Sequence, residues 1–208
     1  AIKLSLSMFF AGFALAQLVA GPLADALGRK KATLIFLAIY LAGSLLATLA
    51  PSVEFILAAR LIQGIGASVG VVVGRAIVRD LYTGADASRI LNTIGIFLAV
   101  GPAMGPTLGG LTLAAFGWNA VFLLMVAFGL MAMGFTLALL KETIIPDLGR
   151  LRPGQLVKNY LEVAGHSRFL AASLVLSGTI GALYAQSTML PFVLINEVGL
   201  TPTQFGMG

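Results

Sequence analysis

The sequence predicts an all-α membrane protein with several transmembrane helices, and its composition and the pattern of its apolar residues lead to this prediction. Hydrophobic residues make up 59% of the 208 residues and charged residues only 10%, whereas a soluble domain typically carries about 25% charged residues. The 25 glycines agree with this class, because glycine is more frequent in membrane helices than in soluble ones. The apolar residues form long runs between polar stretches, as expected for helices surrounded by lipid.

Six apolar segments are long enough to span a bilayer, which takes roughly 20 predominantly apolar residues. They run approximately from Leu4 to Ala24, Ala32 to Ala50, Phe55 to Val78, Ile90 to Ala114, Asn119 to Leu140 and Phe169 to Ile195. The connection between the last two, residues 141–168, is long and polar. Apolar residues recur at helical spacing in it after Pro153. This pattern is compatible with an amphipathic helix on the inner membrane surface or with a solvated linker.

The positions of lysine and arginine predict the orientation of the chain in the membrane. Basic residues follow the first, third and fifth segments, at Arg29, Lys30, Lys31, Arg79, Arg89, Lys141, Arg150, Arg152, Lys158 and Arg168. The opposite loops, near Pro51, near Trp118 and after Asn196, contain neither Lys nor Arg. By the positive-inside rule, the loops after the first, third and fifth segments are cytoplasmic. The net charge of +5 therefore reflects membrane topology, and we expect no binding of nucleic acid.

The sequence gives no support for an enzyme, a metal site or an organic cofactor. There is no cysteine, so neither a disulfide nor a thiolate metal site can form. The single histidine, His166, lies in the polar connection, where a solvated role is expected. The sequence shows no pair of acids and no nucleophile with a base that would suggest catalysis. The glycine-rich strings do not indicate a phosphate-binding loop, because they lie within apolar segments.

The first cytoplasmic turn combines flexible and charged residues. It reads GPLADALGRKK from Gly21 to Lys31. Gly28 permits a tight turn, and Asp25 at the membrane boundary requires cationic partners such as Arg29. A loop that only sets topology would explain the basic residues, but it would not need the whole pattern.

The third segment carries an arginine at Arg60, about 9 Å inside its outer end by helical rise. A charge at this depth is costly and is usually functional or paired, although the side chain could instead extend to the interface. Gln63 and Gly64 lie on the same helical face as Arg60. Small residues recur every four positions along this segment, at Gly66, Gly70 and Gly74, and this stripe would allow close helix packing.

The fourth segment contains the string GPAMGPTLGG, from Gly101 to Gly110. Pro102 and Pro106 each remove a backbone hydrogen bond, which a membrane helix tolerates by bending. A stripe of small residues runs beside them, at Gly101, Gly105, Gly109 and Gly110, and it would let a partner helix pack closely. We therefore expect a kinked, tightly packed helix, with a generic kinked helix as the alternative.

These strings resemble motifs of the major facilitator superfamily. The string from Gly21 to Lys31 matches the signature loop between the second and third helices of that family. The string from Arg60 to Ala67 resembles its fourth-helix motif, and the string from Gly101 to Gly110 resembles the motif of its antiporters. The string from Gly74 to Leu81 and the Gly-Trp pair before Asn119 look most like the Bcr/CflA branch of multidrug efflux transporters.

The resemblance implies a fold with 12 helices in the full-length protein, of which this chain covers about helices two to seven. Residues 1–140 would form the N-terminal transmembrane half without its first helix, residues 141–168 the cytoplasmic connector, and residues 169–208 the first helix of the C-terminal half with an outer loop. It implies an inner gate formed by Gly21, Asp25, Gly28, Arg29 and Asp80. It also implies a role in proton coupling or the cavity for Arg60, Gln63 and Gly64. Tyr184, Gln186 and Thr188 could contact substrate, or they could bond their own backbone.

The function implied is proton-coupled efflux of drugs or other small amphipathic compounds across the inner membrane by alternating access. Such a transporter would use the proton gradient as its energy source. It would lie in the lipid bilayer and would be a monomer. Two alternatives remain open: a symporter or uniporter of a small metabolite, and a membrane receptor or assembly protein that transports nothing. The antiporter string favours efflux over the first alternative, and buried Arg60 with the mid-helix prolines argues against the second.

Overall fold

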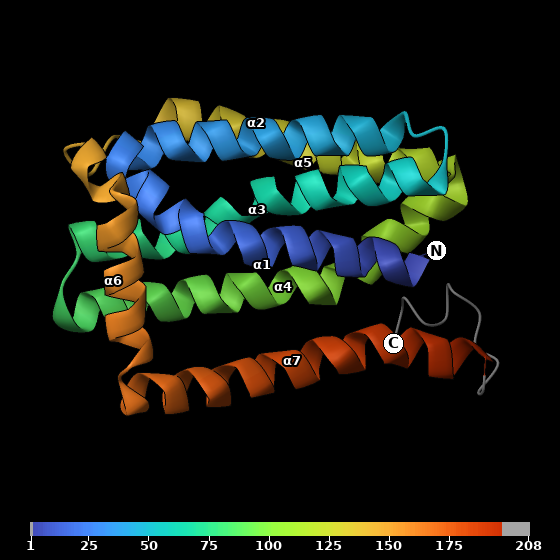
Figure 1. The fold of residues 1–208 in the computed structure, drawn as a ribbon. Helices are drawn as coiled ribbons and strands as arrows, with labels where there is room; N and C mark the ends of the chain where they lie inside the picture. Colours follow the sequence, from blue (N-terminus) through green and yellow to red (C-terminus); the bar gives the residue numbers. More distant parts are fainter. Residues whose placement is uncertain (1, 197–208) are drawn as a thin grey trace. The chain divides into compact units, whose positions relative to one another are not determined.

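The chain folds into α-helices, as the sequence predicts. A computed structural model describes residues 2–196 (Figure 1), and no β-strand occurs in that range. The α-helices are α1 (Ile2–Leu27), α2 (Arg29–Thr48), α3 (Val53–Leu81), α4 (Gly84–Phe116), α5 (Trp118–Leu139), α6 (Pro153–Ala164) and α7 (Ser167–Asn196), with a short 3₁₀ helix, η1 (Leu148–Leu151), before α6.

The six predicted apolar segments correspond to α1 to α5 and α7, apart from one or two residues past the ends of α2 and α5, so their helical nature and order are confirmed. Within the described residues, α1, α2, α3 and α5 are long and apolar enough to cross a membrane, judged by length and composition. Helices α4 and α7 are 33 and 30 residues long. Of the two possibilities for the connector, the structure has the helix, α6, which begins at Pro153, and it also has η1, which the sequence did not predict.

Glycine sets two of the sharp turns between helices. Gly28 lies between α1 and α2 with φ 96°, and Gly117 lies between α4 and α5 with φ 81°. Residues with a side chain rarely adopt this left-handed conformation, so the two glycines allow one helix to follow another almost directly. Helix α3 begins differently, because the Ser52 side chain caps it by accepting a hydrogen bond from the backbone N–H of Phe55 at 3.3 Å.

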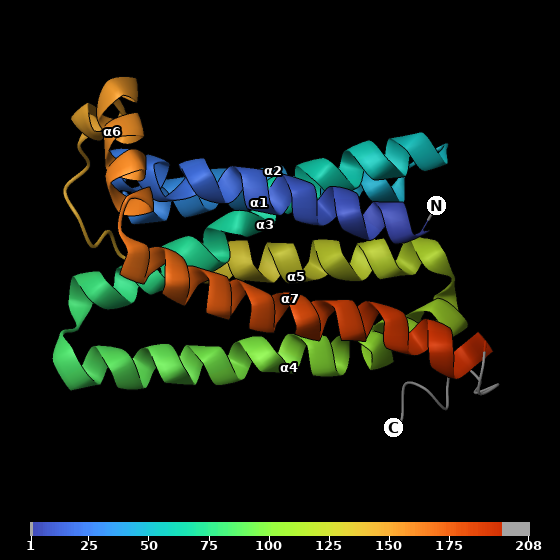
Figure 2. The ribbon, with the colours of Figure 1, turned by 60° about the horizontal axis from the view of Figure 1, so that its bottom comes forward.

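Contacts between residues divide the chain into two compact units, which we describe separately. The first unit contains α1, α2, α3, α5, η1 and the start of α4 up to Gly95. In it, α3 packs against both α1 and α2, and α2 packs against α5 (Figures 1 and 2). The buried core of α1, α2 and α3 consists mainly of small side chains: Ala16, Ala20, Ala24, Ala32, Phe36, Val69 and Val73. The small side chains allow these helices to lie close together.

Pairs of glycines mark the two crossings of α3. A Cβ added at Gly12 of α1 would overlap the backbone of Leu61, and a Cβ added at Gly64 of α3 would overlap the backbone of Phe9. The crossing with α2 is built in the same way. A Cβ at Gly66 would overlap the backbone N of Tyr40, and a Cβ at Gly43 would lie 2.5 Å from the backbone N of Gln63. Both crossings therefore bring backbones together on either side of the segment that carries Arg60 and Gln63.

Large apolar side chains cover the outside of these helices. On α1, Leu15 is 66% exposed, and on α5 Phe135 is 58% exposed. Exposure of this extent along helices of membrane-spanning length fits a lipid environment. The second unit comprises Ile96–Ala115 of α4 together with α6 and α7, and in it α6 contacts α7.

Candidate functional site

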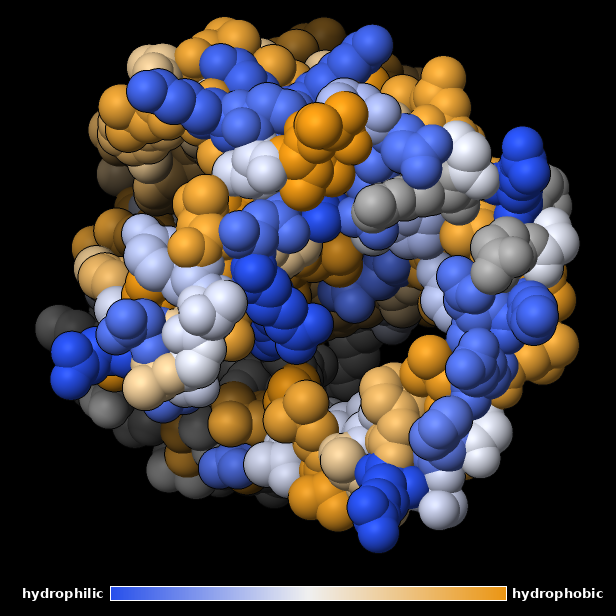
Figure 3. All heavy atoms as spheres, turned by 90° about the vertical axis from the view of Figure 1, so that its left-hand side faces the viewer, coloured by the Kyte–Doolittle hydropathy of each residue, from blue (hydrophilic) through white to orange (hydrophobic). Residues whose placement is uncertain are grey.

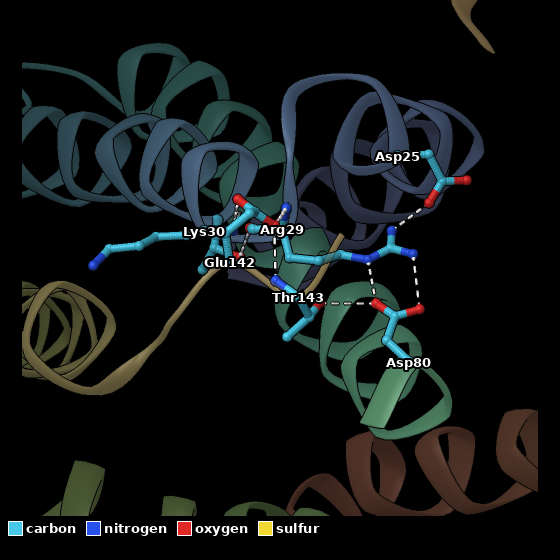
Figure 4. Close-up of polar contacts among 7 residues, drawn as sticks. Asp25, Arg29, Lys30, Asp80, Glu142 and Thr143 are labelled. Carbon is cyan, nitrogen blue, oxygen red and sulfur yellow. Dashed lines mark hydrogen bonds and ion pairs between the residues drawn. The ribbon is translucent and has the colours of Figure 1, made fainter. Parts of the chain in front are cut away.

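The first charged cluster lies where α1 ends, α2 begins and α3 ends. Arg29, the first residue of α2, forms an ion pair with Asp25 of α1. Its Nε donates to Oδ2 of Asp80 on α3 at 2.9 Å, and its Nη2 lies 3.5 Å from Oδ1 of the same carboxylate (Figure 4). The Arg29 side chain is only 8% exposed, and that of Asp80 is 18% exposed. One guanidinium therefore joins the ends of three helices.

The segment after α5 adds a fourth element to this cluster. The carboxylate of Glu142 accepts hydrogen bonds from the backbone N–H groups of Arg29, at 2.6 Å, and Lys30, at 3.2 Å. In return, Nζ of Lys30 donates to the backbone carbonyl of Leu137 in the last turn of α5, at 2.9 Å. The Thr143 hydroxyl donates to Oδ2 of Asp80 at 2.9 Å (Figure 4). We call these six residues, Asp25, Arg29, Lys30, Asp80, Glu142 and Thr143, the inner cluster.

The inner cluster lies at one polar end of an otherwise apolar bundle. Figure 3 looks onto the end where α1 leads into α2, and hydrophilic side chains gather there. This is the end that the positive-inside rule predicts to face the cytoplasm. Ion pairs with low exposure resist screening by salt better than surface pairs do. The cluster is therefore suited to holding the ends of α1, α2 and α3 together, and its ion pairs would break if one of these helices moved.

A second cluster surrounds Arg60 within α3. Nη1 of Arg60 donates a hydrogen bond to Oε1 of Gln63, one turn further along the helix. The guanidinium also lies over the ring of Phe9 on α1, 4.6 Å from its centroid, and Nη1 lies 3.6 Å from the sulfur of Met125 on α5. Nε of Arg60 is buried and has no hydrogen-bond partner among the residues that the structure describes. The guanidinium thus contacts α1, α3 and α5, and Arg60 as a whole is half-buried.

Gln63 connects Arg60 to α2. Its amide nitrogen donates to the hydroxyl of Ser44 at 2.7 Å and lies 3.4 Å from the Met125 sulfur. Neither Gln63 nor Ser44 has measurable exposure. We call Phe9, Ser44, Arg60, Gln63 and Met125 the arginine cluster. Arginine carries a guanidinium cation in proteins, so this cluster can attract anionic groups and repel cationic ones.

The structure brings together most of the residues expected at the inner gate and around Arg60. Asp25, Arg29 and Asp80 form one cluster, and Gly28 makes the turn that places Arg29 beside Asp25. Gly21 lies on α1 facing α3, where an added Cβ would be 3.5 Å from Val72. The remaining gate and coupling residues occupy the positions given above.

The glycines of the antiporter string are not closely packed in the structure. In the described part of the chain, nothing lies within 4 Å of a Cβ added at Gly101, Gly105, Gly109 or Gly110. A stripe of small residues permits close packing but does not supply the attraction that produces it. The side chains of Pro102 and Pro106 lie outside the described residues, although both positions are helical.

The predicted substrate contacts lie on α7, in the second unit. Gln186 is exposed there. The side chains of Tyr184 and Thr188 lie outside the described residues. The possible role of these three residues therefore stays a prediction.

Sequence reasoning missed three contributors to the clusters. Glu142 and Thr143 follow α5: Glu142 lies 112 to 113 residues after its partners at the start of α2, and Thr143 lies 63 residues after its partner Asp80 on α3. An acid beside a hydroxyl, directly after an apolar helix at the basic side of the membrane, is the signal that could have found them. Ser44 lies in an apolar helix, where a hydroxyl that bonds its own backbone is the usual expectation.

A metal centre is not indicated by the side chains that the structure describes. In residues 2–196, no group of three or more His, Asp or Glu side chains is arranged to hold a metal ion.

Comparison with known proteins identifies the family. The sequence profile of the Major Facilitator Superfamily matches residues 1–208, so the chain belongs to this superfamily of membrane transporters. Human MFSD10 (TETRAN), an organic anion transporter of known crystal structure, has the same fold. Its TM-score is 0.69 at 22% identity, over 98% of this chain and 51% of that one.

Bacterial relatives are similar at about one residue in three. The chain is 32% identical to an uncharacterized MFS-type transporter, YdgK, of Bacillus subtilis, over 99% of this chain and 52% of that protein. It is 33% identical to the multidrug resistance protein MdtL of Shewanella sp. strain ANA-3, over 68% of this chain and 36% of that protein. It is 29% identical to a bicyclomycin resistance protein homolog of Haemophilus influenzae, over 99% of this chain and 52% of that protein. The chain spans about half the length of the relatives that it matches throughout.

Proposed function

We propose that the protein containing this chain is a multi-pass transporter of the bacterial inner membrane that exports amphipathic drugs in exchange for protons. The observation that carries the proposal is the Arg60 guanidinium, which donates to Gln63 within an apolar helix bundle and has a buried Nε with no hydrogen-bond partner among the described residues. A buried charge of this kind is costly and usually marks an ion or substrate pathway. Two of the relatives are named for drug resistance, and the antiporter string from Gly101 to Gly110 agrees with this direction of transport.

The proposed division of labour follows the two clusters. The inner cluster would act as a gate that holds the cytoplasmic ends of α1, α2 and α3 together in one state of the cycle. The arginine cluster would couple the movement of a proton to that of the drug, since its positive charge favours a deprotonated carboxylate nearby and disfavours a protonated one. The two halves of such transporters rock about a site near the midplane of the bilayer. In this scheme, residues 1–140 belong to one half, 141–168 to the connector, and 169–208 to the other half of a monomer.

Inside-out membrane vesicles test the proposal. Respiration acidifies such vesicles, and a fluorescent amine such as acridine orange reports the pH gradient. Adding bicyclomycin or ethidium to vesicles that contain the complete transporter should partly collapse the gradient, because each drug molecule that enters releases protons. Vesicles without the transporter are the control. If no compound of a broad cationic and neutral panel moves protons, the proposal fails. If a metabolite and protons cross the membrane in the same direction, the protein is a symporter.

A further inference from the structure

Ser44 of α2 holds two hydrogen bonds of opposite direction beside the Arg60 site. Its hydroxyl donates to the backbone carbonyl of Tyr40 at 2.8 Å and accepts from Nε2 of Gln63 at 2.7 Å. Ser44 is completely buried, as is Gln63. The close approach of the backbones at Gly43 and Gln63 brings the two side chains into reach. Ser44 therefore contacts Gln63, and Gln63 in turn contacts Arg60.

The donor and acceptor properties of these groups allow the chain of hydrogen bonds to run in only one direction. Arginine can only donate, so the amide of Gln63 must turn its oxygen toward Arg60. The NH₂ group of that amide then points the other way and needs an acceptor, which the Ser44 oxygen supplies. The Ser44 hydrogen in turn goes to the Tyr40 carbonyl, which cannot donate. Each bond in such a chain polarises the next one.

Removing the Ser44 oxygen would take away the acceptor that lies 2.7 Å from the Gln63 amide nitrogen and would leave the Tyr40 hydroxyl, which also interacts with Ser44 and Gln63, as the other polar group beside it. Met125 sulfur, at 3.4 Å, is a weak acceptor. A buried amide NH₂ that lacks a good acceptor is costly, and rotation of the amide would turn donor groups toward a donor. The ring of Phe9 attracts the guanidinium without fixing the direction of its N–H groups. Gln63 therefore supplies the oxygen acceptor that the structure records for Arg60, Met125 sulfur is a weaker acceptor of the same guanidinium, and Ser44 is the oxygen acceptor that orients the Gln63 amide.

We propose that Ser44 is a positioning residue for Arg60, acting through Gln63 on proton coupling. This inference rests on the proposed function for its effect on transport. In it, Ser44 touches neither drug nor proton. It holds the Gln63 oxygen toward Arg60, so that the guanidinium stays fixed in direction, with its buried Nε free of a protein partner in the described residues.

Transport by the complete protein, purified and reconstituted in liposomes, tests the effect on coupling, with ethidium as the probe. Ser44→Ala should lower the turnover of ethidium-driven proton movement about tenfold, as expected for loss of one buried directional hydrogen bond. Adding Ser44→Ala to Gln63→Leu should lower it no further, because both changes break the same chain. Additive losses would contradict the inference.

Ser68 provides the matched control. It is equally buried, and its hydroxyl donates to a backbone carbonyl, that of Ile65, at 2.8 Å, but it makes no contact with the arginine cluster that the structure records. Ser68→Ala should leave turnover unchanged. An equal loss in both variants would mean that any buried hydroxyl matters, which would overturn the specific role of Ser44.

A second measurement does not depend on transport. In protein labelled with ¹⁵N-arginine, the Nε signal of Arg60 is identified by its disappearance in Arg60→Lys. Ser44→Ala should shift this signal, and Ser68→Ala should leave it in place. An unshifted signal in Ser44→Ala overturns the positioning role even if transport is lost. If the wild-type protein moves no protons with any drug, the proposed function fails, and the NMR result still decides whether Ser44 positions Arg60.

Discussion

Glu142 caps a helix that begins 113 residues before it. Its Oε1 accepts a hydrogen bond from the backbone N–H of Arg29 at 2.6 Å. Helix α2 follows Gly28, which has no side chain to cap it, so its first N–H groups need an acceptor from elsewhere. A carboxylate at this position also meets the positive end of the helix dipole. The loop after α5 is thereby fastened to the turn that carries Arg29.

Glu142→Gln should lower the thermal midpoint of the purified protein by a few degrees. The neutral amide offers one acceptor oxygen where the carboxylate offers two, and caps of this kind contribute about 1 kcal/mol. Thermal unfolding in detergent measures the effect. Glu162→Gln on α6, an exposed position, is the control and should leave the midpoint unchanged. Equal midpoints for wild type and Glu142→Gln would show that the cap contributes nothing.

Asp80→Asn should loosen the cytoplasmic ends of α1 and α3. The change leaves the nearly buried guanidinium of Arg29 with one carboxylate fewer, at a cost of about 2 kcal/mol. Because the chain has no cysteine, a single Ala24→Cys substitution in the buried core can report access through its rate of maleimide labelling. Labelling should be clearly faster with Asp80→Asn than without it.

Asp86→Asn is the control for that experiment, since Asp86 is exposed in the first turn of α4. Its labelling rate should match that of the parent protein. Labelling at the same slow rate in Asp80→Asn would remove the inner cluster from any role in holding these helix ends.

Gly66→Ala should destabilise the bundle, whereas Gly70→Ala should not. A Cβ at Gly66 would overlap the backbone of Tyr40, and nothing lies within 4 Å of a Cβ at Gly70 in the described residues. Overpacking of this kind typically costs about 1–3 kcal/mol. The fraction of protein that stays monodisperse after heating in detergent measures the difference. If both variants behave alike, the crossing of α2 and α3 is not as close as described.

Arg60→Ala should abolish drug-driven proton movement while leaving the amount of folded protein in the membrane intact. The exposed Arg75 on the same helix supplies the control, and Arg75→Ala should still move protons. The measurement is the drug-induced pH change in inside-out vesicles with matched protein levels. Unaltered coupling in Arg60→Ala would exclude this residue from the mechanism.

The helices and the core of the inner cluster could be predicted from the sequence because their signals are local. Long apolar runs indicate the helices, and the string from Gly21 to Lys31 contains both Asp25 and Arg29. Asp80 was predicted through the resemblance to the major facilitator superfamily, in which an acid at this point pairs with the signature loop. Glu142 could not be predicted in the same way, since its partners are far away in the sequence and a single acid after a helix usually lies in solvent.

Glycine spacing predicted close packing on α3 but not the positions where it occurs. The stripe of Gly66, Gly70 and Gly74 is in close contact only at Gly66, because two straight helices that cross at an angle approach closely over a short length. Gly12 and Gly43, on the partner helices, complete the crossings, and their spacing gave no warning of this. Ser44 was missed because a hydroxyl in an apolar helix is expected to bond its own backbone, as Ser44 does, and this expectation gives no sign of a second bond to Gln63.

Purified protein in liposomes tests the central claim most directly, because no other transporter is present. With a pH gradient imposed, acidic inside, ethidium should accumulate inside the liposomes while protons leave, and an ionophore that dissipates the gradient should stop the accumulation. Ethidium uptake that continues unchanged after the gradient is dissipated, or a gradient that fails to drive any uptake, would contradict drug export in exchange for protons.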